Sequence, residues 1–162
     1  MTTSQTAISE QQFVVFRLAE EEFALGITKV REIIKVTEIT RLPHVAKYIE
    51  GVTNLRGEVI PVVNLRKRFG LEEEEETQDT RIIIVDIDSS KVGFIVDEVK
   101  EVLRVPSDAI DPPPSNVAGL SSTYLEGIAK HDDRLLILLH IDRIMLENEP
   151  LEFSKLEKHL NN

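Results

Sequence analysis

Cysteine and tryptophan are absent from the 162 residues of this chain, and aromatic side chains make up only 5% of it. Without thiols the protein can form neither disulfides nor cysteine-ligated metal sites. No apolar run approaches the roughly 20 residues that cross a bilayer, and the polar start has neither the basic region nor the apolar core of a secretion signal. These absences predict a cytoplasmic protein without direct membrane insertion.

The chain also lacks the residue patterns of an active site or a metal centre. Its four histidines do not pair at metal-ligand spacing, and its seven glycines form no phosphate-binding loop. Ser121 and Ser122 lack a nucleophile elbow, and the candidate acid–base aspartates fall mostly at predicted turns and strand ends. The sequence therefore predicts a protein that is not an enzyme and that needs no metal and no cofactor.

The charge of the chain is acidic and unevenly distributed. A net charge of −10 argues against binding to nucleic acid, which rewards clustered lysine and arginine. Up to Leu71 there are ten basic against eight acidic residues, whereas the remainder has nine against 21. In the first part Arg56, Arg66, Lys67 and Arg68 lie close together and predict an acidic protein partner, while the second part suits a basic one.

A repeat is the most informative feature of the sequence. Tyr48–Val52 returns as Tyr124–Ile128, and the apolar positions that follow each copy also match. In the same order, Lys29–Val36 resembles Glu98–Val105. A duplicated unit indicates a binding scaffold rather than a catalytic cleft. Short strands at intervals of roughly eight to twelve residues predict a mostly β fold with two small antiparallel barrels.

The apolar pattern also predicts where the individual elements lie. Strands are expected at 13–16, 23–27, 52–55, 59–63, 81–85, 92–96 and 135–139. The segment 30–36 is ambiguous, and we read it as a short turn that passes into a strand ending at Pro43. One helical turn is expected at Val45–Ile49. A second short helix follows Asn64 as its cap and ends at Phe69, with Gly70 as its stop.

The expected organisation is a single body with polar ends. Residues 1–11 predict a flexible N-terminus, residues 12–147 the domain, and residues 148–162 a C-terminal helix or tail. The two barrels correspond to about residues 12–71 and 80–147, and an exchange of strands between them stays open. Five glutamates at Glu72–Glu76 mark the seam as a solvated loop.

The run Tyr48–Arg66 resembles the signature of the CheW family, the bacterial chemotaxis coupling proteins. The resemblance continues through Phe23–Ile27, Val30–Ile33, Gly93–Val99 and Tyr124–Gly127, so that it spans roughly residues 11–147. One departure is Asn64, where the family usually has aspartate, and this side chain is expected to cap a helix rather than carry charge. The family fold is two intertwined five-stranded SH3-like barrels, in agreement with the duplication.

The resemblance implies an adaptor without enzymatic activity. It would link the cytoplasmic tip of methyl-accepting chemotaxis receptors to the regulatory domain of the histidine kinase CheA, in arrays at the membrane. Further copies of the coupling protein in array rings are an additional candidate partner. The expected receptor-binding residues are Val30, Glu32, Ile33, Asn54, Leu55, Arg56 and Gly57, and the expected kinase-binding residues are Val99, Glu101 and Val102.

Other readings of the residues stay open at this point. Phe94 and Val96 either complete the receptor surface in a groove between the barrels or belong to the core. The coupling protein of a non-flagellar pathway, for twitching motility or gene regulation, would have the same sequence features. A small ligand-binding or hydrolytic β-barrel is a further alternative, although it would need a polar constellation inside a cavity.

Overall fold

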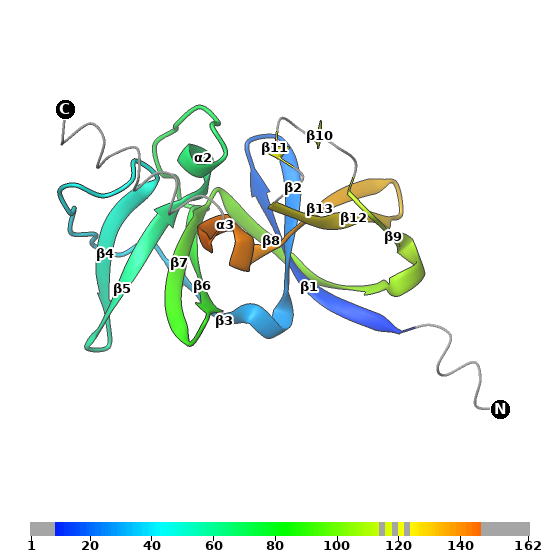
Figure 1. The fold of residues 1–162 in the computed structure, drawn as a ribbon, viewed down its shortest axis with the longest axis horizontal. Helices are drawn as coiled ribbons and strands as arrows, with labels where there is room; N and C mark the ends of the chain where they lie inside the picture. Colours follow the sequence, from blue (N-terminus) through cyan, green and yellow to red (C-terminus); the bar gives the residue numbers. More distant parts are fainter. Residues whose placement is uncertain (1–8, 114–115, 118–119, 122–123, 147–162) are drawn as a thin grey trace.

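The computed structural model describes residues 9–113, 116–117, 120–121 and 124–146 of the chain, and these form two β-sheets side by side (Figure 1). The five-stranded sheet has the order β3 (Val30–Lys35), β6 (Arg81–Ile87), β7 (Ser90–Val96), β5 (Glu58–Asn64) and β4 (Ile49–Leu55). The six-stranded sheet has the order β8 (Glu98–Pro106), β1 (Glu10–Leu18), β2 (Glu21–Gly26), β13 (Arg134–Leu139), β12 (Leu125–His131) and β9 (Ile110–Asp111).

Short elements lie between these strands or, in the case of α3, after the last of them. They are the one-turn helices η1 (Ile27–Lys29) and η2 (Ser107–Ala109), the strand pair β10 (Asn116–Val117) and β11 (Leu120–Ser121), and the helices α2 (Leu65–Arg68) and α3 (Ile141–Leu146). The predicted mostly β fold is therefore confirmed. The pairing of the described strands leaves both sheets open, because each strand order begins and ends at an edge strand.

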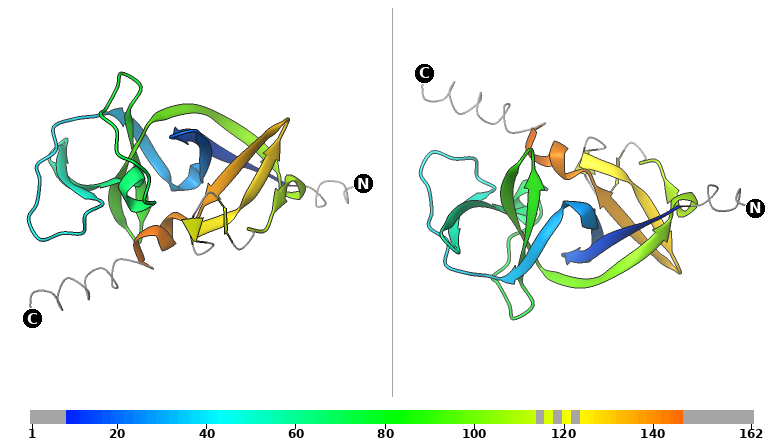
Figure 2. Two further views of the ribbon diagram at one scale, coloured as in Figure 1. Left: turned by 90° about the horizontal axis from the view of Figure 1, so that it is seen from above. Right: turned by 90° about the horizontal axis from the view of Figure 1, so that it is seen from below.

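Each sheet combines hairpins that are far apart in the sequence. The first hairpin, β1–β2, pairs with β8 and β13 of the six-stranded sheet, whereas the later hairpin β6–β7 pairs with β3 and β5. Figure 2 shows from above and below how the chain crosses between the sheets. One result is a parallel strand pair in each otherwise antiparallel sheet, β2 with β13 and β5 with β7.

The largest hydrophobic cluster lies between the two sheets. It joins Phe16 and Phe23 from the six-stranded sheet to Ile83 and Phe94 from the five-stranded sheet, and all four are at most 1% exposed. Two smaller clusters bury the opposite faces of the sheets. The four consecutive apolar residues Ile82–Val85 of β6 are buried because alternate side chains point to clusters on opposite faces of the strand.

Several predicted elements differ from the structure. β3 ends at Lys35, not at Pro43, and Thr40 forms only an isolated bridge with Val52, through hydrogen bonds of 2.8 and 2.9 Å. The predicted helical turn at 45–49 is wrong, since β4 begins at Ile49 after two tight turns. The Ile49 N–H donates to the carbonyl of Ala46 at 3.0 Å and closes the second turn, and the pairing of Ile49 with Val63 of β5 begins the strand there.

The structure also differs from the prediction near the two ends of the domain. Residues 10 and 11, expected within the flexible N-terminus, belong to β1. Leu135, the first residue of the all-apolar strand predicted at 135–139, is 63% exposed, whereas the following residues 136–139 are buried. The expected C-terminal helix or tail at 148–162 lies outside the described residues.

The duplication is visible at the bases of two equivalent hairpins. The Asn64 N–H donates to the carbonyl of Tyr48 at 2.7 Å, and the His140 N–H donates to the carbonyl of Tyr124 at 2.8 Å. A short helix follows each hairpin, α2 after β5 and α3 after β13. As predicted, Asn64 caps α2, because its side-chain oxygen accepts a hydrogen bond from the Lys67 N–H at 3.2 Å.

Candidate partner-binding surface

The tip of the β4–β5 hairpin is a two-residue turn formed by Arg56 and Gly57. Their φ angles of 52° and 87° lie in the left-handed region that a tight turn between right-twisted strands requires. The side-chain oxygen of Asn54 accepts a hydrogen bond from the Gly57 N–H at 2.8 Å. The turn therefore holds Arg56 at the end of a well-defined hairpin, where its side chain is 68% exposed.

Arg56 forms an ion pair with Glu32 of β3. Its Nη2 donates a short hydrogen bond to Oε2 of Glu32, across a sequence separation of 24 residues. This hydrogen bond lowers the pKa of Glu32 and raises the pKa of Arg56. Within the described residues, Nε and Nη1 of Arg56 make no hydrogen bond, so the side chain keeps unused donors at an exposed position.

Further charged pairs surround this one at the same end of the sheet. Lys91 Nζ donates to Glu58 Oε1 at 2.9 Å, and Arg31 Nε lies 3.5 Å from Asp86 Oδ2. Arg31 and Glu58 are exposed and Asp86 and Lys91 are half-buried, so each pair contributes little to the free energy of unfolding. The surface is thus charged, with both signs alternating over a short span.

The seven residues expected at the receptor-binding surface do not all share one face. Ile33 lies opposite Ile83, which belongs to the central cluster, while Glu32 lies opposite Ile84, on the other face of the sheet. Val30 is half-buried against the central cluster, and Ile33 is 40% exposed. The other five lie together at the hairpin tip, where Asn54 and Leu55 point to opposite faces of the strand, and are here named the tip patch: Glu32, Asn54, Leu55, Arg56 and Gly57.

Phe94 and Val96, considered as a possible second side of the receptor surface, are core residues. Both have no exposed surface and belong to the central cluster between the sheets. Of the two readings left open by the sequence, burial in the core is the one that the structure supports. Neither side chain is available to a partner.

The cationic cluster expected to attract an acidic partner is largely neutralised inside the protein. Arg66 binds the carboxylate of Asp97 through Nε at 2.9 Å and Nη2 at 2.5 Å. Lys67 Nζ lies 2.8 Å from Glu50 Oε1, and Arg68 is stacked between two tyrosine rings. Of the four cations, only Arg56 projects at a hairpin tip. The four cations, which are close together in the sequence, therefore do not form one cationic surface in the fold.

Asp97 is the centre of a network that the sequence analysis missed. Besides the bonds from Arg66, its Oδ2 accepts the Ala19 N–H at 2.8 Å and lies 3.5 Å from Arg17 Nη1. Burial alone would raise the pKa of Asp97, but the hydrogen bonds from Arg66 and Ala19 outweigh burial and lower it. No spacing in the sequence links residue 97 to residues 66 and 19, so only the fold reveals the network.

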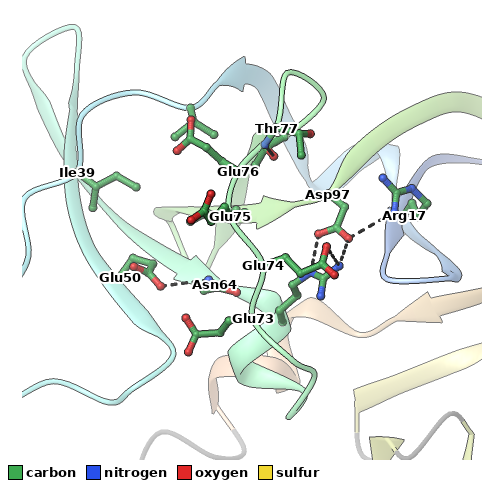
Figure 3. A pocket seen from close by; sticks show the side chains of 14 residues that line it. Arg17, Ile39, Glu50, Asn64, Glu73, Glu74, Glu75, Glu76, Thr77 and Asp97 are labelled. Carbon is green, nitrogen blue, oxygen red and sulfur yellow. Dashed lines mark hydrogen bonds and ion pairs between the residues drawn. The ribbon is translucent and has the colours of Figure 1, made fainter.

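The acidic loop lies over part of this network. The carbonyl oxygen of Glu72 accepts from Arg66 Nη1 at 2.5 Å, and the carboxylate of Glu74 lies 3.4 Å from Arg66 Nη2. Figure 3 shows the loop crossing a pocket, with Glu50 on one side and Asp97 on the other. The predicted solvated loop is exposed along its whole length, but it also contacts α2.

The residues expected to bind the kinase lie on β8, an edge strand that pairs only with β1. Val99 is half-buried against the central cluster, Glu101 is exposed, and Val102 is 49% exposed. Arg134 Nη2 lies 2.9 Å from Glu101 Oε2 and also binds Glu22 of β2, whose pKa it lowers. This strand therefore offers one apolar side chain beside a group of paired charges.

The described part of the chain holds no group of three or more histidine or acidic side chains placed to bind a metal ion. Its longest helix, α3, has six residues, and none of the described helices is long and apolar enough to span a membrane.

Comparison with known proteins gives a consistent result. A family model described as the CheW-like domain matches residues 12–149. The chain is 39% identical over 135 residues to the chemotaxis protein CheW of Bacillus subtilis (strain 168), covering 83% of this chain and 86% of that protein. It is 33% identical over 156 residues to the chemotaxis protein CheW of Treponema pallidum (strain Nichols), covering 93% and 92%.

A solved structure is also similar over most of the chain. The crystal structure of the scaffolding protein TtCheW from Thermoanaerobacter tengcongensis matches with a TM-score of 0.81 and 42% identity, covering 85% of this chain and 93% of that one. Since identity and structural similarity are both high, the predicted fold class and the predicted family resemblance are confirmed.

Proposed function

The chain belongs to the CheW-like domain family, and from that premise we propose that it is a non-enzymatic adaptor coupling chemotaxis receptors to the histidine kinase CheA. Its partners would be the cytoplasmic tip of methyl-accepting receptors and the regulatory domain of the kinase. It would act in the cytoplasm and be recruited to receptor arrays at the membrane.

The observation that carries the proposal is the construction of the tip patch. A two-residue turn fixes Arg56, and an ion pair to Glu32 fixes the direction of its guanidinium. An arginine that is already ordered loses little conformational entropy on binding, and its planar fork suits a carboxylate or a carbonyl of a partner. Leu55, half-buried beside it, adds apolar contact.

The kinase would bind on the other sheet. β8 is an edge strand of the six-stranded sheet, whereas the tip patch belongs to the five-stranded sheet. Val102 is the exposed apolar residue of β8, and Glu101 lies beside it in an ion pair with Arg134. Two partners could therefore bind without competing for the same residues.

The function follows from having two such faces on one body. A protein that holds a receptor with one face and a kinase with the other raises the effective concentration of the kinase at the receptor. No chemical step is needed for this. The buried hydrophobic cluster that the two sheets share would keep the two partners at a defined separation.

A binding titration with two purified partners tests the proposal. The chain is titrated with a chemoreceptor signalling tip and, separately, with the regulatory domain of CheA, and then with both together. Binding to both without competition is the expected result. Failure of the folded chain to bind either cognate partner would overturn the proposed function.

The variant Arg56→Glu tests the tip patch within the same experiment. It places a like charge beside Glu32 and removes the donors, so receptor affinity should fall by roughly tenfold or more, given the ~1.5–3 kcal/mol of a charged hydrogen bond. Kinase affinity should be unchanged. Arg41→Glu is the matched control, because that side chain is 81% exposed and lies outside the tip patch. Unchanged receptor affinity in Arg56→Glu would remove the tip patch from the receptor site.

A further inference from the structure

Arg68 lies between the two tyrosines at the bases of the equivalent hairpins. Its guanidinium carbon is 4.8 Å from the ring centre of Tyr48 and 4.7 Å from that of Tyr124. Tyr48 immediately precedes β4, and Tyr124 immediately precedes β12. One cation therefore stacks on a residue from each copy of the repeat, and so on one residue next to each sheet.

Hydrogen bonds from Arg68 strengthen the same connection. Nη2 donates to the hydroxyl of Tyr124 at 2.9 Å, and Nε and Nη2 both donate to the carbonyl of Ile144 at 3.1 and 2.9 Å. Arg68 belongs to α2 and Ile144 to α3, the helices that follow the two equivalent hairpins. The guanidinium thus joins the bases of both hairpins and both helices.

The repeat explains why a single arginine makes this connection. Counting from Asn64 and His140, the position equivalent to Arg68 in the second copy is Ile144, which is completely buried. Two cations at these equivalent positions would meet near the contact of the two helices and repel each other. An apolar residue in one copy, with its carbonyl as acceptor, removes this conflict.

Both hairpins also contribute side chains to the central cluster, among them Val63 of β5 and Leu139 of β13, and the contacts of Arg68 add a polar connection to this shared apolar one. β4 is an edge strand, and the hairpin β4–β5 is joined to the rest of its sheet through β7 and the isolated bridge to Thr40. The hairpin β12–β13 is joined to its own sheet through β2 and the short β9. Phe69, next to Arg68, continues the contact by packing on Tyr124 and Phe23.

We infer that Arg68 is a positioning residue that joins the two copies of the repeat and sets the orientation of the hairpin β4–β5 relative to the six-stranded sheet. Its contacts with Tyr48, Tyr124 and Ile144 are here named the clasp. The hairpin carries the tip patch, and the six-stranded sheet carries β8. Only the consequence for partner binding depends on the proposed function. The orientation itself is a property of the free protein and can be measured without any partner.

The absence of cysteine makes this measurement direct. Spin labels are attached to Val59→Cys in β5 and Asp133→Cys in the β12–β13 turn, both of which are exposed. Pulsed electron paramagnetic resonance then gives the distribution of distances between the two hairpins. The labelled parent chain should give one narrow distribution.

Three substitutions separate the parts of the clasp. Arg68→Met removes the charge and all donors, and it should broaden or shift the distribution. Arg68→Lys keeps the charge near the rings but lacks the planar fork that reaches Tyr124 and Ile144 together, so a smaller broadening is expected. Tyr124→Phe keeps the ring and loses one hydrogen bond, and should stay close to the parent.

Two controls distinguish positioning from stability. Arg104→Met removes an exposed arginine of β8 that makes no ion pair within the described residues, and it should leave the distribution unchanged. Ile84→Val removes one buried methylene group inside the five-stranded sheet and controls for lost stability alone. Circular dichroism establishes that each variant is folded.

The measured distance distributions either support or overturn the role of Arg68. Broadening in Arg68→Met that neither control shows would support the clasp, and an unchanged distribution in the folded variant would overturn it. If Arg68→Met does not fold, Arg68→Lys takes its place with the same criterion. If the parent chain binds neither the receptor tip nor the kinase domain, the proposed function fails while the distance measurement stands.

Discussion

The ion pair between Arg66 and Asp97 should contribute substantially to stability, and Asp97→Asn tests this. The two side chains are only 10% and 17% exposed, and two hydrogen bonds join them. Removing one partner of a buried pair leaves an uncompensated charge and costs about 3–5 kcal/mol. Since asparagine keeps the shape and one acceptor, we expect a loss near the lower end, about 3 kcal/mol.

That loss should be visible in both chemical and thermal unfolding. For a domain of this size, each kcal/mol shifts the melting temperature by roughly 2–4 °C, so a decrease of roughly 6–12 °C is expected. Because tryptophan is absent, urea unfolding is best followed by far-UV circular dichroism. The control is Asp133→Asn, an exposed aspartate without an ion pair in the described residues, which should stay within about 0.5 kcal/mol of the parent.

The pH dependence provides a second test of the same pair. The pKa of Asp97 is lower in the folded protein than its ordinary value of about 3.9. A lowered pKa stabilises the folded state above the unfolded value, and this contribution is lost as the pH falls through the folded pKa. The difference in unfolding free energy between parent and Asp97→Asn should therefore be constant near neutral pH and shrink below about pH 4. Equal stability of Asp97→Asn and Asp133→Asn at pH 7 would refute the reasoning.

Two further substitutions test the backbone of the tip-patch hairpin. In Gly51→Ala the new Cβ would lie 2.0 Å from the Thr40 carbonyl oxygen, at a φ of 151°, so a loss of about 3 kcal/mol or more in urea unfolding is expected. Gly26→Ala, which meets nothing within 4 Å, should have little effect, and equal losses would contradict the steric argument. Asn64→Ala removes the cap of α2 and should cost about 1 kcal/mol in the same assay. No measurable loss would mean that the cap does not stabilise α2.

Local chemistry made much of the fold predictable from the sequence. The glycine after Arg56 and the flanking apolar residues are typical of a hairpin with a two-residue turn, and the structure has that hairpin. Asn64 followed by Gly70 indicated a short capped helix, which is α2. These features depend on a few neighbouring residues, so the sequence contains all the information needed.

Long-range partners were not predictable in the same way. The apolar residues of 81–85 predicted a strand, but any other apolar strand could have been its neighbour. Arg66 looked like part of a surface cluster because its partner, Asp97, is distant in the sequence. The pairing of Glu32 with Arg56 fits the predicted receptor set, yet the separation of Ile33 onto the other face required the strand register.

The exchange of hairpins between the sheets has a consequence for synthesis of the chain. β1 and β2 leave the ribosome before the other strands described, and their neighbours in the six-stranded sheet, β8 and β13, are made much later. The five-stranded sheet, in contrast, can be completed once β7 has emerged. The outer edges of the hairpin β1–β2 therefore stay unpaired while the five-stranded sheet, whose strands follow in the sequence, forms. Strand pairing across such a long sequence separation is slow. During translation this hairpin is the part of the nascent protein most in need of protection from wrong partners.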